Sequence, residues 1–372
     1  MSSHASRIIV VGGGILGTMH AVFAVRRGAT VLHFDRHERP RGASVRNFGL
    51  VWVSGRAPGG ELILALRARE LWEQLGHDVP GTGFRGNGSM TVVSSDAEVK
   101  VLEATAARAD ASERGLSLLD ADEIRRANPG LHGDYLAGLH CSRDAAVEPH
   151  LTLGALRSWL EASGRYEFLA PREVFGLGDH AVIDSTGVRH RADLVVLCLG
   201  AVHNGPMGSL LEGTPLRPVR LQMMETEPLG RALTTSVVDG NSLRYYGAFR
   251  KFSTSMLGPQ DEMLSRHGMQ MICQQRLDGC LTLGDTHEYE QPFAFDISEE
   301  ATSLVHQLAH KALGAPFPKI RRRWAGVYDQ LVDVSDEELY LRREVPSGVI
   351  ALTGVGGRGM TISPAVAEDT FR

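Results

Sequence analysis

Apolar and polar positions near the start of the chain follow two different periods in turn. Residues 8–11 are apolar throughout and predict a short buried strand, and residues 15–27 repeat apolar side chains at helical spacing. Gly28 follows as a helix-ending signal, and residues 30–34 predict a second strand. A strand, a helix and a second strand in this order are typical of a parallel sheet.

Helical and extended patterns alternate through the rest of the chain. The apolar run at 193–199 is typical of a strand buried on both faces of a parallel sheet, and residues 83–93 predict a hairpin with its turn in a Gly-Asn-Gly sequence. Residues 219–283 predict antiparallel strands, and alternation within one of them would send Tyr245 and Tyr246 to opposite faces. Helices are predicted at 61–75, 98–114, 120–127, 150–163 and 298–313, and a strand at 349–352 precedes a last helix at 361–369.

Glycines recur in the pattern Gly-x-Gly-x-x-Gly near both ends of the chain, at Gly12, Gly14 and Gly17 and again at Gly354, Gly356 and Gly359. A dinucleotide site needs a strand before the glycines, a helix after them, and a second strand that ends in an acid about 20 residues on. The first copy has all three, with Asp35 as the acid, whereas too few residues follow the second copy. The first copy therefore predicts a phosphate-binding turn, and Asp35 is expected to accept hydrogen bonds from a ribose.

Composition limits the classes of partner. The chain has 372 residues, of which 43% are hydrophobic and 22% charged, so two globular domains are expected. The net charge of -5 argues against a nucleic-acid partner. No apolar run nears the roughly 20 residues that span a bilayer, so a cytoplasmic protein without membrane insertion is expected. The four cysteines are scattered without metal-binding spacing, so no metal site is predicted.

Four segments together carry a resemblance to a known family. They are residues 10–17 with Asp35 and Arg36, residues 42–49, residues 198–201, and residues 356–365. The chain resembles the FAD-dependent amine and amino-acid oxidoreductases of the D-amino acid oxidase superfamily, such as sarcosine oxidase and glycine oxidase. The resemblance implies an α/β fold with two domains: an FAD-binding, Rossmann-like domain with a central parallel sheet, and an α+β substrate domain with a largely antiparallel sheet. The FAD-binding domain is expected at 1–85, 145–215 and 320–372, and the substrate domain at 86–144 and 216–319.

FAD would then extend between the two glycine motifs. The first would hold the pyrophosphate, and the helix at 361–369 would direct its N-terminus at the flavin ring, where negative charge develops on reduction. No cysteine occurs at 324–329, where sarcosine oxidases attach the flavin, so non-covalent FAD is expected. Arg36 either covers the adenine or is a surface charge, and Arg46 either contacts a phosphate or the substrate or is a solvated loop charge. The residues expected to bind FAD are Gly12, Gly14, Ile15, Leu16, Gly17, Asp35, Arg36, Ser44, Arg46, Asn47, Phe48, Gly49, Val174, Gly200, Gly356, Gly357, Arg358, Gly359, Met360 and Thr361.

The activity implied by the resemblance is oxidation of a small anionic amine by hydride transfer to flavin N5. The imine so formed would be hydrolysed to an aldehyde or keto acid plus ammonia or methylamine, and oxygen or another acceptor would reoxidise the flavin. His287, Tyr246 and Tyr328 are the candidate catalytic residues. Tyr328 stands where glycine oxidase and its relatives carry an arginine that binds the substrate carboxylate. The candidates for binding the substrate anion are therefore Arg46, Arg244, Arg250 and Arg358.

The substrate class is suggested by two segments, 43–49 and 284–289. They resemble a subgroup associated with aminophosphonate breakdown, whose substrates include 2-aminoethylphosphonate and its N-methyl derivative. A phosphonate would need more than one cation or several hydrogen-bond donors. Two other hypotheses stay open. One is a 2-hydroxy-acid or glycerophosphate-type dehydrogenase with His287 as general base, and the other is a binding protein of the same fold without catalysis.

Overall fold

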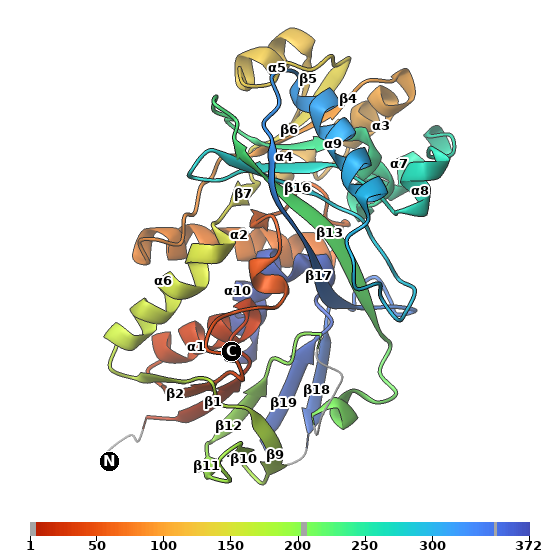
Figure 1. Ribbon diagram of the computed structural model, residues 1–372. Helices are drawn as coiled ribbons and strands as arrows, with labels where there is room; N and C mark the ends of the chain where they lie inside the picture. Colours follow the sequence, from red (N-terminus) through yellow and green to blue (C-terminus); the bar gives the residue numbers. More distant parts are fainter. Residues whose placement is uncertain (1–4, 202–206, 346–347) are drawn as a thin grey trace.

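The computed structural model describes residues 5–201, 207–345 and 348–372, and its strands form two large sheets (Figure 1). The strands of the first sheet are β1 (Arg7–Val11), β2 (Thr30–Phe34), β8 (Tyr166–Leu169), β12 (Leu194–Leu197), β18 (Leu341–Val345) and β19 (Val349–Thr353). They lie in the order β18-β19-β12-β1-β2-β8. Every neighbouring pair runs parallel except β18 and β19, which are antiparallel.

Both faces of this first sheet are covered. Ile8 and Val10 of β1 pack with α1 (Ile15–Arg26), α2 (Gly60–Asp78), α6 (Pro149–Ala162) and α10 (Gly359–Thr370). Ile9 and Val11, which point the other way, pack with a small sheet of β9 (Val174–Gly178), β10 (Ala181–Asp184) and β11 (Arg189–Arg191). Because successive residues of a strand face opposite sides, a strand buried on both sides is apolar at every position.

The second sheet lies in the upper part of Figure 1 and is mostly antiparallel. Its strands are β4 (Ser89–Val93), β5 (Leu116–Asp120), β6 (Ala137–Cys141), β13 (Leu216–Pro228), β14 (Ser236–Asp239), β15 (Ile272–Gln275), β16 (Cys280–Gly284) and β17 (Ile320–Leu331). Their order is β17-β13-β16-β15-β14-β4-β6-β5, and only the pair β14 and β4 is parallel among these described strands. Helix α9 (Glu299–Leu313) packs Ala301, Val305 and Ala309 against the same core.

Shorter elements complete the chain. They are β3 (Leu50–Val51), β7 (Ala145–Ala146), α3 (Asp96–Ala106), α4 (Ala111–Arg114), α5 (Ala121–Ala127), α7 (Gly247–Met256) and α8 (Glu262–Arg266). The predicted α/β class, with a parallel sheet and a mostly antiparallel one, is confirmed. The division into two domains stays a prediction. Because β17 pairs with β13 from Leu216 to Thr226, its place in the second sheet favours a boundary after Leu331 rather than at 320.

Three local predictions were wrong. The hairpin at 83–93 does not form, because β6 and β14 occupy both edges of β4 and Arg85 pairs instead with Ala146. The helix predicted at 98–114 is divided into α3 and α4. Tyr245 and Tyr246 lie not in a strand but between a 3₁₀ turn and α7, because Ala248, Phe249 and Phe252 pack at helical spacing into a core shared with α3.

Candidate active site

A cavity of about 1090 Å³ begins at the carboxyl ends of β1, β2 and β12 and reaches the second sheet. Ligands of open α/β sheets bind at that end of the strands. The expected FAD-binding residues that line the cavity are Gly12, Gly14, Ile15, Leu16, Gly17, Asp35, Arg36, Ser44, Arg46, Asn47, Phe48, Val174, Gly200, Gly356, Gly357, Arg358, Gly359 and Met360. The expected catalytic and anion-binding residues that line it are Tyr246, Arg244, Arg250, His287 and Tyr328. Gly49 and Thr361 do not line it.

The first glycine turn is shaped by close backbone contacts. Gly12 has a φ of +107°, and a Cβ added there would lie 2.1 Å from the carbonyl oxygen of Cys198 at the end of β12. A Cβ on Gly17 would lie 2.0 Å from the carbonyl oxygen of Gly12. Both positions therefore exclude side chains, and the N-terminus of α1 comes close to the sheet at the cavity wall.

Amide groups and a carboxylate meet at this turn. The Ser44 hydroxyl accepts a hydrogen bond from Ile15 N at 2.9 Å, and no acid occupies the first turn of α1. The Asp35 carboxylate accepts from Gly13 N at 2.6 Å and from His37 N at 2.7 Å. Helix N-terminal amides that line a cavity favour phosphate, so the turn fits a pyrophosphate with the ribose beside Asp35.

Two supporting residues of this turn carried no signal in the sequence. The His33 ring bonds the carbonyl oxygen of Gly12 at 3.0 Å and the hydroxyl of Tyr166 at 2.9 Å. Burial lowers the pKa of His33 to about 4, so the ring is neutral at neutral pH. Arg157 donates to the carbonyl oxygen of Gly13 at 2.7 Å. Both side chains fix the glycine backbone from behind.

The loop from 42 to 49 is held both by bonds within the loop and by bonds to other parts of the chain. Asn47 donates to the carbonyl oxygen of Ala43 at 2.8 Å and accepts from Gly49 N at 2.7 Å. Arg46 donates to the carbonyl oxygen of Ala325 at 2.6 Å. A Cβ on Gly49 would lie 2.3 Å from the carbonyl oxygen of Val147, which explains this glycine by packing.

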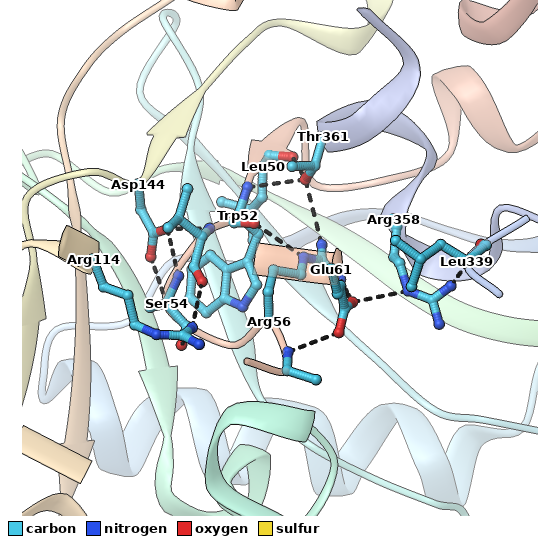
Figure 2. Close-up of polar contacts among 12 residues, drawn as sticks. Leu50, Trp52, Ser54, Arg56, Glu61, Arg114, Asp144, Leu339, Arg358 and Thr361 are labelled. Atoms are coloured by element: carbon cyan, nitrogen blue, oxygen red, sulfur yellow. Dashed lines mark hydrogen bonds and ion pairs between the residues drawn. The ribbon is translucent and has the colours of Figure 1, made fainter. Parts of the chain in front are cut away.

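The second glycine motif begins α10 beside a network of charges (Figure 2). Glu61 accepts from Arg358 Nε at 2.9 Å and from Ala57 N at 2.7 Å, and it lies 3.4 Å from an Arg56 nitrogen. Burial opposes ionisation of Glu61, but the charges of Arg56 and Arg358 outweigh it and lower its pKa below 4.5. Thr361 accepts from Trp52 N at 2.9 Å. Arg358 is therefore already paired with an acid, and Thr361 fixes the chain outside the cavity.

Aromatic rings line the part of the cavity that faces the second sheet. Tyr245 lies against the ring of His287, with centroids 4.2 Å apart, and edge-on to Tyr246 at 5.1 Å. The ring of Tyr246 lies 5.7 Å from that of Trp52. Burial raises the pKa of Tyr245, Tyr246 and Tyr328, so these hydroxyls stay protonated. His287 bonds the carbonyl oxygen of Gly268 through Nδ1 at 2.9 Å, which orients its ring.

Three arginines line this region without an acidic partner in the described part of the chain, and two of them are among the expected anion-binding residues. These two are Arg244, which is half-buried, and Arg250, which is exposed on α7. Arg217, which sequence reasoning missed, also lines the cavity and lies over the ring of Tyr289 at 4.2 Å. Because Arg46 is bonded to a backbone carbonyl and Arg358 to Glu61, Arg244 and Arg250 are the better anion-binding candidates.

A glycine turn that opens through one cavity into a tyrosine-lined chamber suits a dinucleotide cofactor with a substrate beside it. The chain belongs to the DAO family of FAD-dependent oxidoreductases, whose model matches residues 7–371. Its fold is similar to that of glycine oxidase from Geobacillus kaustophilus, at a TM-score of 0.76 and 18% identity over 98% of this chain and 93% of that one. It is also similar to L-alpha-glycerophosphate oxidase from Mycoplasma pneumoniae with FAD bound, at a TM-score of 0.73 and 15% identity over 99% and 94% of the chains.

A curated relative by sequence is one of the subunits of an opine oxidase from Rhizobium meliloti, which is 27% identical over 169 residues. The match covers 42% of this chain and 45% of that protein, so it spans less than half the length of either.

The site fits FAD. The glycine turn excludes side chains where a pyrophosphate would lie, and the cavity joins it to the N-terminus of α10. Among the described residues, no helix has the length and hydropathy to cross a membrane. The same residues contain no group of three or more His, Cys, Asp or Glu side chains that could hold a metal ion.

Proposed function

We propose that this FAD-dependent oxidoreductase oxidises a small amine that carries a separate anionic group, with aminophosphonates such as 2-aminoethylphosphonate or its N-methyl derivative as substrates. When bound, FAD accepts a hydride from the carbon next to the nitrogen. The products would be an aldehyde or keto acid and either ammonia or methylamine. The observation that carries the proposal is the pair of arginines, Arg244 and Arg250, that line the cavity with no acidic partner among the described residues.

Arg244 and Arg250 lie close in sequence on either side of the N-terminus of α7. Two guanidinium groups suit a phosphonate, whose oxygens accept several charge-assisted hydrogen bonds. Tyr328, in place of an arginine, supports an anion other than a simple α-carboxylate. Tyr245, Tyr246 and Tyr328 would orient the substrate and exclude water, which hydride transfer requires more than it requires a strong base.

The test is the visible spectrum of the purified enzyme during addition of amines. The panel contains 2-aminoethylphosphonate, its N-methyl derivative, glycine and sarcosine. Bleaching of the flavin bands by an aminophosphonate, with release of ammonia or methylamine, is expected. Bleaching by α-amino acids alone would refute the aminophosphonate assignment, and no bleaching by any amine would refute amine oxidation.

The anion assignment is tested with Arg244→Met. Loss of a charge-assisted hydrogen bond of about 1.5 to 3 kcal/mol would raise KM for the anionic amine roughly 10- to 150-fold. The matched control is Arg266→Met, since Arg266 is exposed on α8 and does not line the cavity. Equal KM values for the two variants would show that Arg244 does not bind the anion.

A second candidate function is oxidation of an alcohol, as in the 2-hydroxy-acid and glycerophosphate enzymes of this fold. It is favoured by the likeness to L-alpha-glycerophosphate oxidase and by His287, whose Nε2 has no partner in the described residues once Nδ1 bonds Gly268. Flavin bleaching by glycerophosphate or a 2-hydroxy acid, without release of ammonia or methylamine, would favour this function. Retention of no FAD by the purified protein would instead favour a binding protein.

We further propose that FAD is bound without a covalent link and that the enzyme acts in the cytoplasm. Residues 324–329 contain no cysteine, and all four cysteines are free and buried. Acid precipitation should release all of the flavin into the supernatant, and flavin retained in the pellet would contradict this. Peroxide formed during turnover would identify oxygen as the acceptor, whereas turnover only with an added dye would indicate another acceptor.

A further inference from the structure

Asp285 is a buried acid in the wall of the cavity, and none of the described candidate anion-binding arginines forms an ion pair with it. It follows β16 directly and is only 4% exposed. Its neighbours along the wall include Tyr245, Tyr246 and His287, all of which line the same cavity.

The carboxyl group of Asp285 has one side-chain partner in the described part of the chain. Gln270 Nε2 donates to its Oδ1 at 3.2 Å, and the backbones of the two residues bond each other in both directions, at 2.9 and 3.2 Å. No arginine, lysine or histidine of the described residues lies within ion-pair distance of Asp285, whereas the buried Glu61 is paired with two arginines. Buried carboxylates are normally paired with a cation. Asp285 is therefore suited to bind a cation that the described residues do not supply.

Gln270 adds a second acceptor at the same place. Its side chain is buried and lines the cavity, and its Oε1 has no hydrogen-bond partner among the described residues. A buried amide oxygen without a donor is unusual in a folded protein. Gln270 Oε1 has no donor, and the Asp285 carboxylate has only one side-chain donor among the described residues. Such acceptors suit a group with several N–H bonds and no lone pair to offer, which is the chemistry of an ammonium ion.

The rings around Asp285 favour a cation as well. Tyr245 and His287 lie against each other, and Tyr246 packs edge-on to Tyr245. Faces of aromatic rings attract ammonium groups, most strongly when water is excluded. Burial is the main cause of the raised pKa of Tyr245 and Tyr246, and the charge of Asp285 adds to it.

We propose that Asp285, held by Gln270, binds the ammonium group of the substrate and accepts a proton from it. This rests on the proposed function, because it concerns the nitrogen end of the same amine. In the step, the N–H bond breaks, its electrons stay on nitrogen as a lone pair, and the proton forms an O–H bond on the carboxylate. FAD, when bound, would supply the oxidant for the free amine: a hydride would leave the adjacent carbon, and the nitrogen lone pair would form the C=N bond. Water adds to that bond, which gives the carbonyl product and ammonia or methylamine.

Arginines and Asp285 together would recognise the substrate at two ends. Arg244 and Arg250 would bind the anionic group of the substrate, and Asp285 would bind its ammonium group. An amine without an anion, or an anion without an amine, would satisfy only one of the two. The site would therefore select a zwitterion over either half of it.

The titration of Asp285 supports this role. Burial raises the pKa of Asp285 above 3.8, although His287 and Gln270 lower it in part. The charge of Asp285 also raises the pKa of four tyrosine hydroxyls, which remain protonated. They belong to Tyr245, Tyr246, Tyr289 and Tyr328. A carboxylate with a raised pKa is a better proton acceptor than an exposed one.

The experiment compares Asp285→Asn with a matched buried acid, Asp239→Asn, in the holoenzyme. Asp239 is also buried, and burial raises its pKa to about 6, but it bonds Met271 N and Asn241 and does not line the cavity. The flavin is first reduced, and calorimetry under anaerobic conditions then measures binding of 2-aminoethylphosphonate and of ethylphosphonate, which lacks the amine. Glycine and acetate form the second pair.

Asp285→Asn should weaken binding of the amine roughly 10- to 150-fold and change binding of its amine-free partner less than about twofold. Asp239→Asn should preserve the preference for the amine. Equal weakening of both ligands by Asp285→Asn, or no weakening of the amine, would overturn the proposal. If amines bleach the wild-type flavin while Asp285→Asn keeps its amine preference, only the Asp285 proposal fails. If no amine bleaches the wild-type flavin, the proposed function fails.

The wild-type enzyme gives a second test if Asp285→Asn does not fold. Amine binding should weaken as the pH falls through the raised pKa of Asp285, because protonation removes the charge that holds the ammonium. Ethylphosphonate has no ammonium group, so its binding should show only the effect of phosphonate protonation, which both ligands share. Parallel pH profiles for the two ligands would overturn the proposal.

Discussion

Replacement of Glu61 by glutamine tests how the second glycine motif is held. Glu61 is 9% exposed and lies between two guanidinium groups, those of Arg56 and Arg358 (Figure 2). Breaking a buried ion pair costs about 3 to 5 kcal/mol, because the remaining charges stay buried without a partner. The lower end applies here, since glutamine keeps one acceptor oxygen and Arg358 is 29% exposed and also donates to Leu339.

A loss of about 3 kcal/mol should lower Tm by roughly 6 °C, at about 2 °C per kcal/mol for a long chain. Thermal unfolding is followed at a fixed, saturating FAD concentration, because bound cofactor itself raises Tm. The control is Glu73→Gln on the same helix. Glu73 is paired with Arg69 one turn away, and its side chain is 67% exposed. A helix pair at i and i+4 whose acid is exposed contributes about 0.3 to 0.5 kcal/mol.

The difference between wild type and Glu61→Gln should also depend on pH. Since the folded protein lowers the pKa of Glu61, its stabilisation is complete above pH 4.5 and is lost as the pH falls through the lowered value. The Tm difference should thus be constant from pH 6 to 8 and shrink below pH 4.5. A Tm loss no greater than that of Glu73→Gln, or a difference that persists unchanged at low pH, would refute the assignment.

Two further variants test the first glycine motif. Gly12→Ala should abolish FAD retention, because the new Cβ would lie 2.1 Å from the carbonyl oxygen of Cys198, whereas Gly154→Ala on α6, whose Cβ would contact nothing within 4 Å, should retain the flavin. The flavin-to-protein absorbance ratio measures this, and a yellow Gly12→Ala protein would contradict it. Ser44→Ala should weaken FAD binding to the apoprotein about 10-fold, because Ile15 N and the pyrophosphate would lose a hydroxyl partner, and an unchanged Kd in a fluorescence titration would argue against that contact.

Site residues on regular elements were the most predictable from the sequence. The β1–α1–β2 unit and its glycines were found because strand, turn and helix signals lie within about 25 neighbouring residues. Residues 244–249 were misassigned, because a six-residue window with two tyrosines suits a strand, and only packing against α3 selects a helix. Asp285 lies in the segment 284–289, which resembles the aminophosphonate subgroup, but no local sequence feature distinguished it from His287 as a site residue.

The sequence alone determined the order of strands and helices around the nucleotide turn, the positions that must be glycine, and the family resemblance. These depend on residues close together in the chain, so local spacing suffices. Only the tertiary structure decided which charges are already paired. Glu61 and Arg358 are 297 residues apart, and their contact pairs Arg358 with an acid, which leaves Arg244 and Arg250 as the better candidates for binding the anion. The tertiary structure also placed Gln270 and the tyrosines beside Asp285. Such contacts depend on how separate elements pack rather than on any local pattern.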